Sequence, residues 1–430
     1  MLWTQTSPAQ RRAIRQWQCY ALAIGILGEL FLAGDWYGFA AVMTFVSHTL
    51  HLSPAEAGFV QGAFAITYCI GMLFWSPFAR KWSARKLFAT GLLGTGVFML
   101  AQAAAGDFAQ LVGARLLIGF FDAAVWVGTM KLIVGWFPTE RHGATMGTLL
   151  AAFSLAITLD FAVGIPMAIS LGWRAFLVTL GGLTLLVGAI GMLTIKGSPQ
   201  EIGVAGFRWQ AGPEPSHHGG DVALSRIFRA RWIYIGWLAI FGDTFALAAT
   251  ATWVVPAFIQ QQGMPVQNAA LIGTLMGLSQ VAFLLVGGWL SDRVSRITMI
   301  RLGAALSVFS ALSFLAATHY AMSWGMLLAI AGASGVAVLS GGAIFSLVSE
   351  NYGEKLAATA IGYAELGGIV STFIAPTLMG AVIDLTHSFT AAFIAFVAVE
   401  AVILGALLMI ASKRATAPAA AIAHQAPRKA

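Results

Sequence analysis

Long apolar runs recur along the whole chain and are separated by short polar or charged segments. Each run has about 20 or more residues, enough for a helix to cross about 30 Å of hydrocarbon. They predict membrane-spanning helices near residues 17–40, 58–78, 87–105, 109–136, 144–169, 174–194, 231–258, 267–290, 298–317, 323–348, 357–382 and 389–411. The expected fold class is therefore an all-α integral membrane protein with twelve transmembrane helices.

Composition agrees with this class, because 59% of the 430 residues are hydrophobic and only 10% are charged. An average soluble domain has roughly a quarter charged residues. Cys19 and Cys69 both fall inside predicted spans, so we expect neither a disulfide framework nor a cysteine metal site.

Lys and Arg residues are distributed unevenly between the predicted spans. If both termini are cytoplasmic, all 24 except Arg115, Lys131 and Arg174 fall in cytoplasmic segments. This asymmetry is the positive-inside signal of membrane insertion. The net charge of +7 is thus explained without nucleic-acid binding. The expected location is the cell membrane, which is the inner membrane if the source is Gram-negative.

One long polar segment interrupts the spans, and it predicts the domain organisation. Residues 196–230 are rich in Gly, Pro and charge, as is typical of a linker. The expected organisation is a cytoplasmic segment 1–16, a six-helix bundle 17–195, the cytoplasmic linker 196–230, a second six-helix bundle 231–411 and a disordered cytoplasmic tail 412–430.

The two halves resemble each other at an offset of about 212 residues, counted along the printed sequence. The segment 76-SPFARKWSARK-86 corresponds to 288-GWLSDRVSR-296, and Pro166 has its counterpart in Pro376. Repeated halves place a substrate site near mid-membrane at their interface, where one half rocks against the other. This predicts two pseudo-symmetric bundles and transport by alternating access.

Acidic residues outnumber basic residues within the predicted spans. The acids are Glu29, Asp35, Asp122, Asp160, Asp243, Glu365 and Glu400, and the bases are Arg115 and Lys131. They cannot all be paired, so some acids are expected to be protonated for part of a transport cycle, since burial disfavours the ionised form. A proton is thus the expected coupling ion, and no other cofactor is expected.

The stretch 115-RLLIGFFD-122 places two charges inside an apolar run. A helix turns 100° per residue, so Arg115 and Asp122 lie within about 20° of each other and about 10 Å apart along the axis. Charges at this depth normally mark a pathway or a partner, and one cavity is expected to hold both. Lys131 lies near the opposite side, so a substrate contact and a side chain reaching the membrane surface both stay open for it.

Two motifs resemble those of a known transporter superfamily. The segment 288-GWLSDRVSR-296 is similar to the G-x-L-x-D-R-x-x-R loop of the major facilitator superfamily, and 136-WFPTERHGATMG-147 followed by 171-LGWRAF-176 resembles its first-half signature. The resemblance covers nearly the whole chain and implies the superfamily's fold.

The loop motif also implies a conformational latch. By this resemblance the latch residues are Asp292, Arg293 and Arg296. The first-half loop departs from the pattern, because Arg80 stands where the usual Asp would be. A latch is therefore expected in the second half, whereas 80-RKWSARK-86 is equally explained as a basic loop that directs insertion.

A narrower resemblance rests on the AR-L-L-x-G-x-x-acid pattern in the fourth span and on Asp35 followed by 52-LSPAEAG-58. Both resemble the anion:cation symporter family. The resemblance implies proton coupling by Asp35 and Asp122 and an ion-pairing or substrate contact by Arg115. That family usually has Arg directly after the first-span Asp, but here Trp36 follows it. A monocarboxylate held by Arg115 is therefore a better expectation than a multiply charged anion.

Further substrate contacts are expected from side chains in spans that flank the interface of the halves. Trp36 adjoins Asp35, and Trp126 lies one turn beyond Asp122. The other candidates are Tyr37, Gln61, Tyr68, Lys131, Asp243, Gln280 and Glu365. Functional and structural roles both stay open for Asp160, Glu29 and Glu400, because hydrogen bonding between helices also explains buried acids.

Together these patterns predict a proton-coupled secondary active transporter, a symporter of a small organic anion that works as a monomer in the lipid bilayer and binds no nucleic acid. The alternatives are a proton-coupled exporter of drugs or cationic metabolites, an organic-anion exchanger and, more remotely, a non-transporting ligand sensor. An enzyme is not expected, because no span carries a metal-ligand cluster, a nucleophile–base spacing or a phosphate-binding glycine loop.

Overall fold

The computed structural model describes residues 3–207, 209, 225–291 and 293–412. Within these residues the secondary structure is helical throughout, and 12 helices are long and apolar enough to cross a membrane. The predicted fold class is confirmed, and each predicted span overlaps one of these helices.

The N-terminal half folds into six spans. Its elements are η1 (Trp3–Gln5), α1 (Pro8–Leu50), α2 (Pro54–Lys81), α3 (Ala84–Ala104), α4 (Phe108–Trp136), α5 (Thr139–Leu159), η2 (Asp160–Gly164), α6 (Ile165–Leu171), α7 (Trp173–Thr194) and η3 (Pro199–Ile202). The fifth span comprises α5, η2 and α6, and η2 is a π-helical turn. Pro166 follows this turn directly; proline cannot donate a helical hydrogen bond, which favours such a local widening.

The C-terminal half repeats this arrangement. Its elements are α8 (Ser225–Arg229), α9 (Arg231–Gln260), α10 (Val266–Ser291), α11 (Arg296–His319), α12 (Trp324–Ala333), η4 (Ser334–Val338), α13 (Gly341–Thr386) and α14 (Phe389–Ser412). The tenth span is broken by the 3-10 turn η4, and the helix α13 contains the end of the tenth span and the whole eleventh.

The motif 52-LSPAEAG-58 has a clear local role, because it starts α2. Ser53 is the N-cap residue: its hydroxyl accepts from the Glu56 amide at 3.2 Å, and its own amide donates to Glu56 Oε2 at 2.9 Å. Pro54 occupies the first helical position, where its missing N–H costs nothing. The motif therefore sets the sharp turn between the first two spans.

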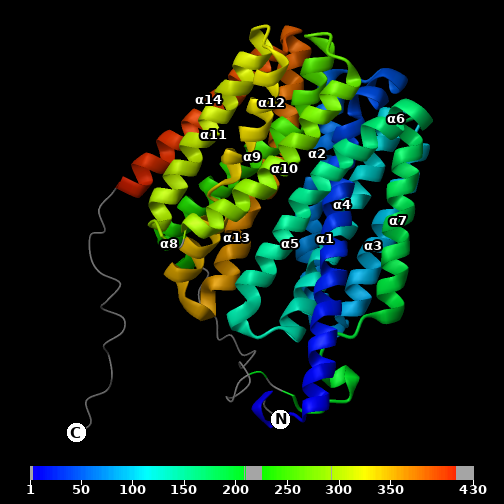
Figure 1. The fold of residues 1–430 in the computed structure, drawn as a ribbon, viewed down its shortest axis with the longest axis vertical. Helices are drawn as coiled ribbons and strands as arrows, with labels where there is room; N and C mark the ends of the chain where they lie inside the picture. The colour runs from blue at the N-terminus through cyan, green and yellow to red at the C-terminus, as the bar shows by residue number, and fades with distance from the viewer. Residues whose placement is uncertain (1–2, 208, 210–224, 292, 413–430) are drawn as a thin grey trace.

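The two halves lie side by side and converge toward the end opposite the N-terminus (Figure 1). Glycines allow the close approach there. A Cβ on Gly58 would lie 2.2 Å from the Pro376 carbonyl oxygen, and one on Gly380 would lie 2.4 Å from the Pro54 carbonyl oxygen. Any larger residue would push the halves apart. The described conformation is thus tightly closed at this end.

Several predicted segments fall outside this description. Residues 208 and 210–224 of the predicted linker 196–230, nearly all of the tail 412–430, and Asp292 lie outside the described residues. The domain boundaries therefore stay predictions.

Candidate functional site

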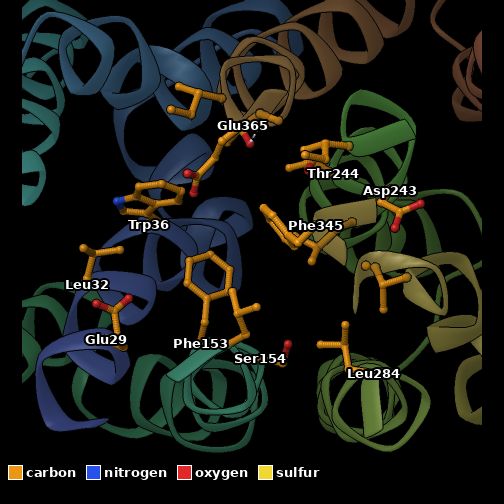
Figure 2. A pocket seen from close by; sticks show the side chains of 18 of the residues that line it. Glu29, Leu32, Trp36, Phe153, Ser154, Asp243, Thr244, Leu284, Phe345 and Glu365 are labelled. Atoms are coloured by element: carbon orange, nitrogen blue, oxygen red, sulfur yellow. Dashed lines mark hydrogen bonds between the residues drawn. The ribbon is translucent and has the colours of Figure 1, made fainter. Parts of the chain in front are cut away.

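A cavity of about 190 Å³ lies between the two halves (Figure 2). Its aromatic lining residues are Trp36, Tyr37, Tyr68, Trp126, Phe153 and Phe345, its hydroxyl residues are Ser154, Thr244 and Thr372, and its carboxylates are Glu29, Asp243 and Glu365. Among the described residues, no Lys, Arg or His lines it. The cavity is thus an aromatic chamber with an excess of acidic groups.

Both halves supply walls of this chamber. Glu365 extends from α13 toward Trp36 on α1, and Phe345 projects between the two halves (Figure 2). The Trp36 ring is braced by Phe64 at 4.6 Å and by Tyr68 at 5.0 Å between ring centroids. The aromatic wall is therefore formed before any ligand binds.

Arg115 is fully buried and does not line the cavity. Its guanidinium donates to the backbone carbonyls of Asp35, Trp36, Val60 and Gln61 at 2.7 to 3.2 Å. The rings of Phe39 and Phe64 lie 5.5 and 4.7 Å from its guanidinium carbon. In this conformation Arg115 joins α4 to α1 and α2 and has no access to a substrate.

Asp122 is also fully buried, and neutral donors satisfy both of its oxygens. The Trp36 indole N–H donates to Oδ2 at 2.9 Å, and the Thr95 hydroxyl donates to Oδ1 at 2.6 Å. Because the Trp36 carbonyl also accepts from Arg115, one residue of α1 contacts both ends of the 115–122 stretch. The two charges thus share a face, as predicted, but they meet through Trp36.

Asp35 does not reach the cavity either. Its Oδ1 accepts from the Thr184 hydroxyl at 3.3 Å, and its Oδ2 has no hydrogen-bond partner in the described part of the chain. Asp160, at the start of the π-helical turn, interacts electrostatically with Asp35 and also has one unpartnered oxygen, by the same count. Asp35 and Asp122 thus lie behind the residues that line the cavity. Their expected role in proton coupling remains a prediction.

The other predicted contacts separate into two groups. Trp36, Tyr37, Tyr68, Trp126, Asp243 and Glu365 line the cavity, whereas Gln61, Lys131 and Gln280 do not. Lys131 donates to the carbonyls of Ala79 and Trp82 at 2.7 and 2.6 Å and so fastens the end of α2. Gln61 donates to the Trp36 carbonyl at 3.0 Å.

The predicted latch can be followed only in part, since Asp292 lies outside the described residues. Arg296 forms an ion pair with Glu350 at 3.1 Å and donates to the Ser291 hydroxyl at 2.9 Å. The Arg293 guanidinium lies over the Trp289 ring at 3.8 Å from its centroid. Arg296 thus ties the end of α10 to α13, and its role as a latch remains a prediction.

Some lining residues were not among the sequence candidates. Glu29 was left open, and Phe153, Ser154, Thr244 and Phe345 were not singled out. Thr244 directly follows Asp243, which is a usable signal. No comparable signal marks Phe153 or Phe345, because a phenylalanine facing a cavity and one facing lipid look alike in a sequence.

The sequence model of the Major Facilitator Superfamily matches residues 25–368 and 236–429. The chain belongs to this superfamily. It is therefore a multi-pass membrane transporter and not an enzyme, in agreement with the prediction from the sequence.

Curated relatives span most of the chain. It is 21% identical over 380 residues to the hexuronate transporter of Bacillus subtilis (strain 168), covering 85% of this chain and 89% of that protein. It is 24% identical over 387 residues to the niacin transporter NiaP of Acinetobacter baylyi, covering 82% and 85%. A bacterial homolog of the human lysosomal transporter Spinster, solved in an inward-facing, unoccupied conformation, has a TM-score of 0.75 at 14% identity, covering 92% of this chain and 97% of that one. This likeness confirms the predicted fold of two six-helix bundles.

Proposed function

We propose that this chain is a proton-coupled symporter of a small monocarboxylate with a flat, mainly apolar ring. The observation that carries the proposal is the cavity lining, which combines six aromatic side chains and three carboxylates with no described basic group. Aromatic and aliphatic side chains form most of this lining, which suits a flat apolar ring better than the many hydroxyl groups of a sugar acid. The relatives that transport hexuronate and niacin support an organic acid, and the aromatic walls favour the ring-bearing kind.

The acidic lining explains why protons must accompany the anion. At about 7 Å and an effective dielectric constant of about 20, each ionised carboxylate repels a bound anion by roughly 2 kcal/mol. This lowers affinity more than about tenfold for each charge. Protonated Glu29 and Glu365 no longer repel, and a protonated Glu365 can donate a hydrogen bond to the substrate carboxylate. Proton binding therefore precedes anion binding.

Trp36 provides a link between the cavity and the buried acid Asp122. Its ring faces the cavity and its indole N–H donates to Asp122. Protonation of Asp122 weakens this hydrogen bond, because a neutral acid is a poorer acceptor than a carboxylate. Release of the indole lets the ring reorient against the substrate. In this mechanism Arg115 holds α1 in place, and Glu365 takes over the recognition of the substrate carboxylate.

A proton-coupled exporter of lipophilic cations is the second candidate. The same observation favours it, since three carboxylates and six aromatic side chains also suit a cation. The two functions differ in the direction of proton movement relative to substrate. An anion symporter acidifies the compartment that the substrate enters, whereas an exchanger of cation for proton makes it more alkaline.

The test uses purified protein in liposomes that contain a pH-sensitive dye. Nicotinate, benzoate, glucuronate and tetraphenylphosphonium are added separately outside. The proposal expects luminal acidification with nicotinate or benzoate. It is wrong if only tetraphenylphosphonium gives a signal, and that signal is alkaline. Acidification with glucuronate alone would retain symport but overturn a substrate with a flat, mainly apolar ring.

A variant pair tests the role of Glu365. Glu365→Gln should abolish accumulation driven by a pH gradient while exchange of labelled for unlabelled substrate continues, because exchange needs no net proton movement. Asp384→Asn is the matched control, since it makes the same change on the same helix and does not line the cavity. Normal accumulation by Glu365→Gln would contradict the proposed role.

A further inference from the structure

A second, much smaller cavity lies within the C-terminal half. Its polar lining residues are Asp243 on α9, Ser307 on α11 and Glu400 on α14, and the remaining residues that line it are apolar or glycine. Asp243 also lines the central cavity. This single residue therefore stands between the substrate chamber and a buried acid that the proposed function does not use.

Glu400 is 1% exposed, and neither of its carboxyl oxygens has a hydrogen-bond partner among the described residues. The Ser307 hydroxyl is 0% exposed and is unpartnered by the same criterion. A Cβ on Gly242 would lie 3.5 Å from Glu400 Oε2, so the carboxyl group packs directly against α9. Three unsatisfied polar atoms thus gather around one small cavity, whereas buried polar groups are normally hydrogen-bonded.

The size of this cavity restricts what can satisfy these atoms. It does not accommodate a water molecule, and a water needs both room and several polar partners. An ionised and unpaired carboxylate at this depth costs several kcal/mol. A proton needs no volume, neutralises Glu400 and turns one of its oxygens into a donor. It is therefore the occupant that the space and the chemistry both allow.

Asp243 offers the route by which a proton reaches Glu400. The Ser340 hydroxyl donates to the Asp243 carboxylate, with 3.0 Å to each oxygen. Asp243 and Glu400 line the same small cavity. Ionising both at once is unfavourable, because like charges in a buried site repel strongly.

The charged surroundings of this pair are all acidic. Across the central cavity Asp243 shares a chamber with Glu365 and Glu29. On the side of α11 and α14, the groups lining the small cavity are Ser307 and Glu400 themselves. Among the described residues, no Lys, Arg or His lines either cavity. No basic group is in place to hold the pair in its doubly ionised form.

We propose that Asp243 and Glu400 form a second proton-binding site, which exchanges its proton with the central cavity through Asp243. The inference rests on the proposed function in one respect, namely that a proton is the coupling ion. It adds a proton site in the half that contains neither Asp35 nor Asp122. It also identifies the Asp243 side chain as the connection between Glu400 and the central cavity.

Infrared difference spectroscopy tests this without any substrate. The purified protein in liposomes is titrated from acidic to alkaline pH, and the carbonyl band of protonated carboxylic acids is followed. We expect Glu400→Gln to lose one component of this pH-dependent band. Asp243→Asn should also lose its own component and slow the response of Glu400 to a pH jump.

A pair of serine variants serves as the matched test. Ser307→Ala should shift the Glu400 band, because the hydroxyl faces that carboxyl group. Ser310 lies one turn away on the same helix, and its hydroxyl donates to the Ser334 carbonyl. Ser310→Ala should therefore leave the Glu400 band unchanged. Melting temperatures and size-exclusion profiles establish that each variant is folded.

Three results would overturn the proposal. Glu400→Gln with an unaltered spectrum excludes a proton at Glu400. A Glu400 band that is present at every pH shows a permanently neutral, structural acid. A band that responds to sodium chloride and not to pH indicates a sodium site. Because no substrate is used, these outcomes are independent of the transport assay, where the proposed function fails on its own if no carboxylate moves protons.

Discussion

The two halves place a hydroxyl residue at equivalent positions, but its surroundings differ. In the N-terminal half the Thr95 hydroxyl donates to Asp122 at 2.6 Å. Ser307 stands at the corresponding position of the C-terminal half and faces Glu400 across a small cavity, with no partner in the described part of the chain. The same helical frame thus holds a satisfied acid on one side and an unsatisfied acid on the other.

The difference extends to the basic residues. Arg115 binds four backbone carbonyls in the N-terminal half, whereas Leu327 occupies the equivalent position in the C-terminal half. The N-terminal network is therefore saturated with hydrogen bonds and well suited to hold α1 and α4 together. Glu400 in the C-terminal half lacks such support, and this makes it better suited to gain and lose a proton.

Removal of Arg115 should have the largest effect. Arg115→Met keeps much of the volume but removes the guanidinium donor from the carbonyls of Asp35, Val60 and Gln61 and from the Gln61 side chain. Each buried acceptor that loses its only side-chain donor costs about 1–3 kcal/mol, and several are lost together here. We expect a strongly lowered melting temperature and poor recovery of folded protein.

Arg12→Ala, an exposed change on α1, is the control. A stable Arg115→Met protein that only loses substrate affinity would show that the arginine serves the substrate and not the frame. Such a result would remove the contrast between the two halves.

The next largest effect is expected where the halves touch. Gly58→Ala places a methyl group 2.2 Å from the Pro376 carbonyl oxygen, so the closed end cannot form without a backbone shift. Transport should fall at least about tenfold, since a gating equilibrium moved by about 1.4 kcal/mol changes tenfold. Cysteine labelling from the two sides of the membrane reports the shift in accessibility.

Gly182→Ala is the matched control for Gly58→Ala, because nothing lies within 4 Å of its added Cβ. Unchanged transport and labelling in Gly58→Ala would mean that the halves do not need this close contact.

A direct comparison of the two hydroxyls should show a smaller effect. Thr95→Ala leaves a buried Asp122 oxygen without its donor, which costs about 1–3 kcal/mol. Ser307 faces Glu400 across a small cavity and makes no hydrogen bond of ordinary geometry to the described residues, so Ser307→Ala should destabilise the protein by less than about 1 kcal/mol, below the cost for Thr95→Ala. Chemical unfolding of both variants measures the difference, and equal losses would show that Ser307 is satisfied as well as Thr95.

The fold was accessible from the sequence because its signals are long and redundant. Twelve apolar runs and the repeated motifs each point to the same helices, and a few residues of error at each end do not matter. The common face of Arg115 and Asp122 followed from helix periodicity alone. The capping box of 52-LSPAEAG-58 is equally recognisable from its residue types.

The site was less accessible, because it depends on which neighbour each buried group finds. No pattern in the sequence shows that Arg115 binds backbone carbonyls in place of a substrate or a carboxylate. The same holds for Trp36, whose position next to Asp35 suggested a cavity wall but not a hydrogen bond to Asp122 on another helix. Contacts between helices that are distant in sequence determine these roles.

The last prediction concerns Trp36, where the hydrogen-bonded network around Arg115 and Asp122 meets the cavity. Trp36→Phe keeps an aromatic ring against Phe64 and Tyr68 but removes the indole N–H that donates to Asp122. One lost hydrogen bond to a buried acid costs about 1–3 kcal/mol, and Thr95 still holds the other oxygen. We expect a modest loss of stability. We also expect that transport continues but no longer depends on pH as it does in the wild type.

Trp126→Phe, also in the cavity wall, controls for ring size. If both variants show the same pH response as the wild type, Asp122 does not communicate with the cavity through Trp36, and the network around Arg115 and Asp122 serves only as a frame.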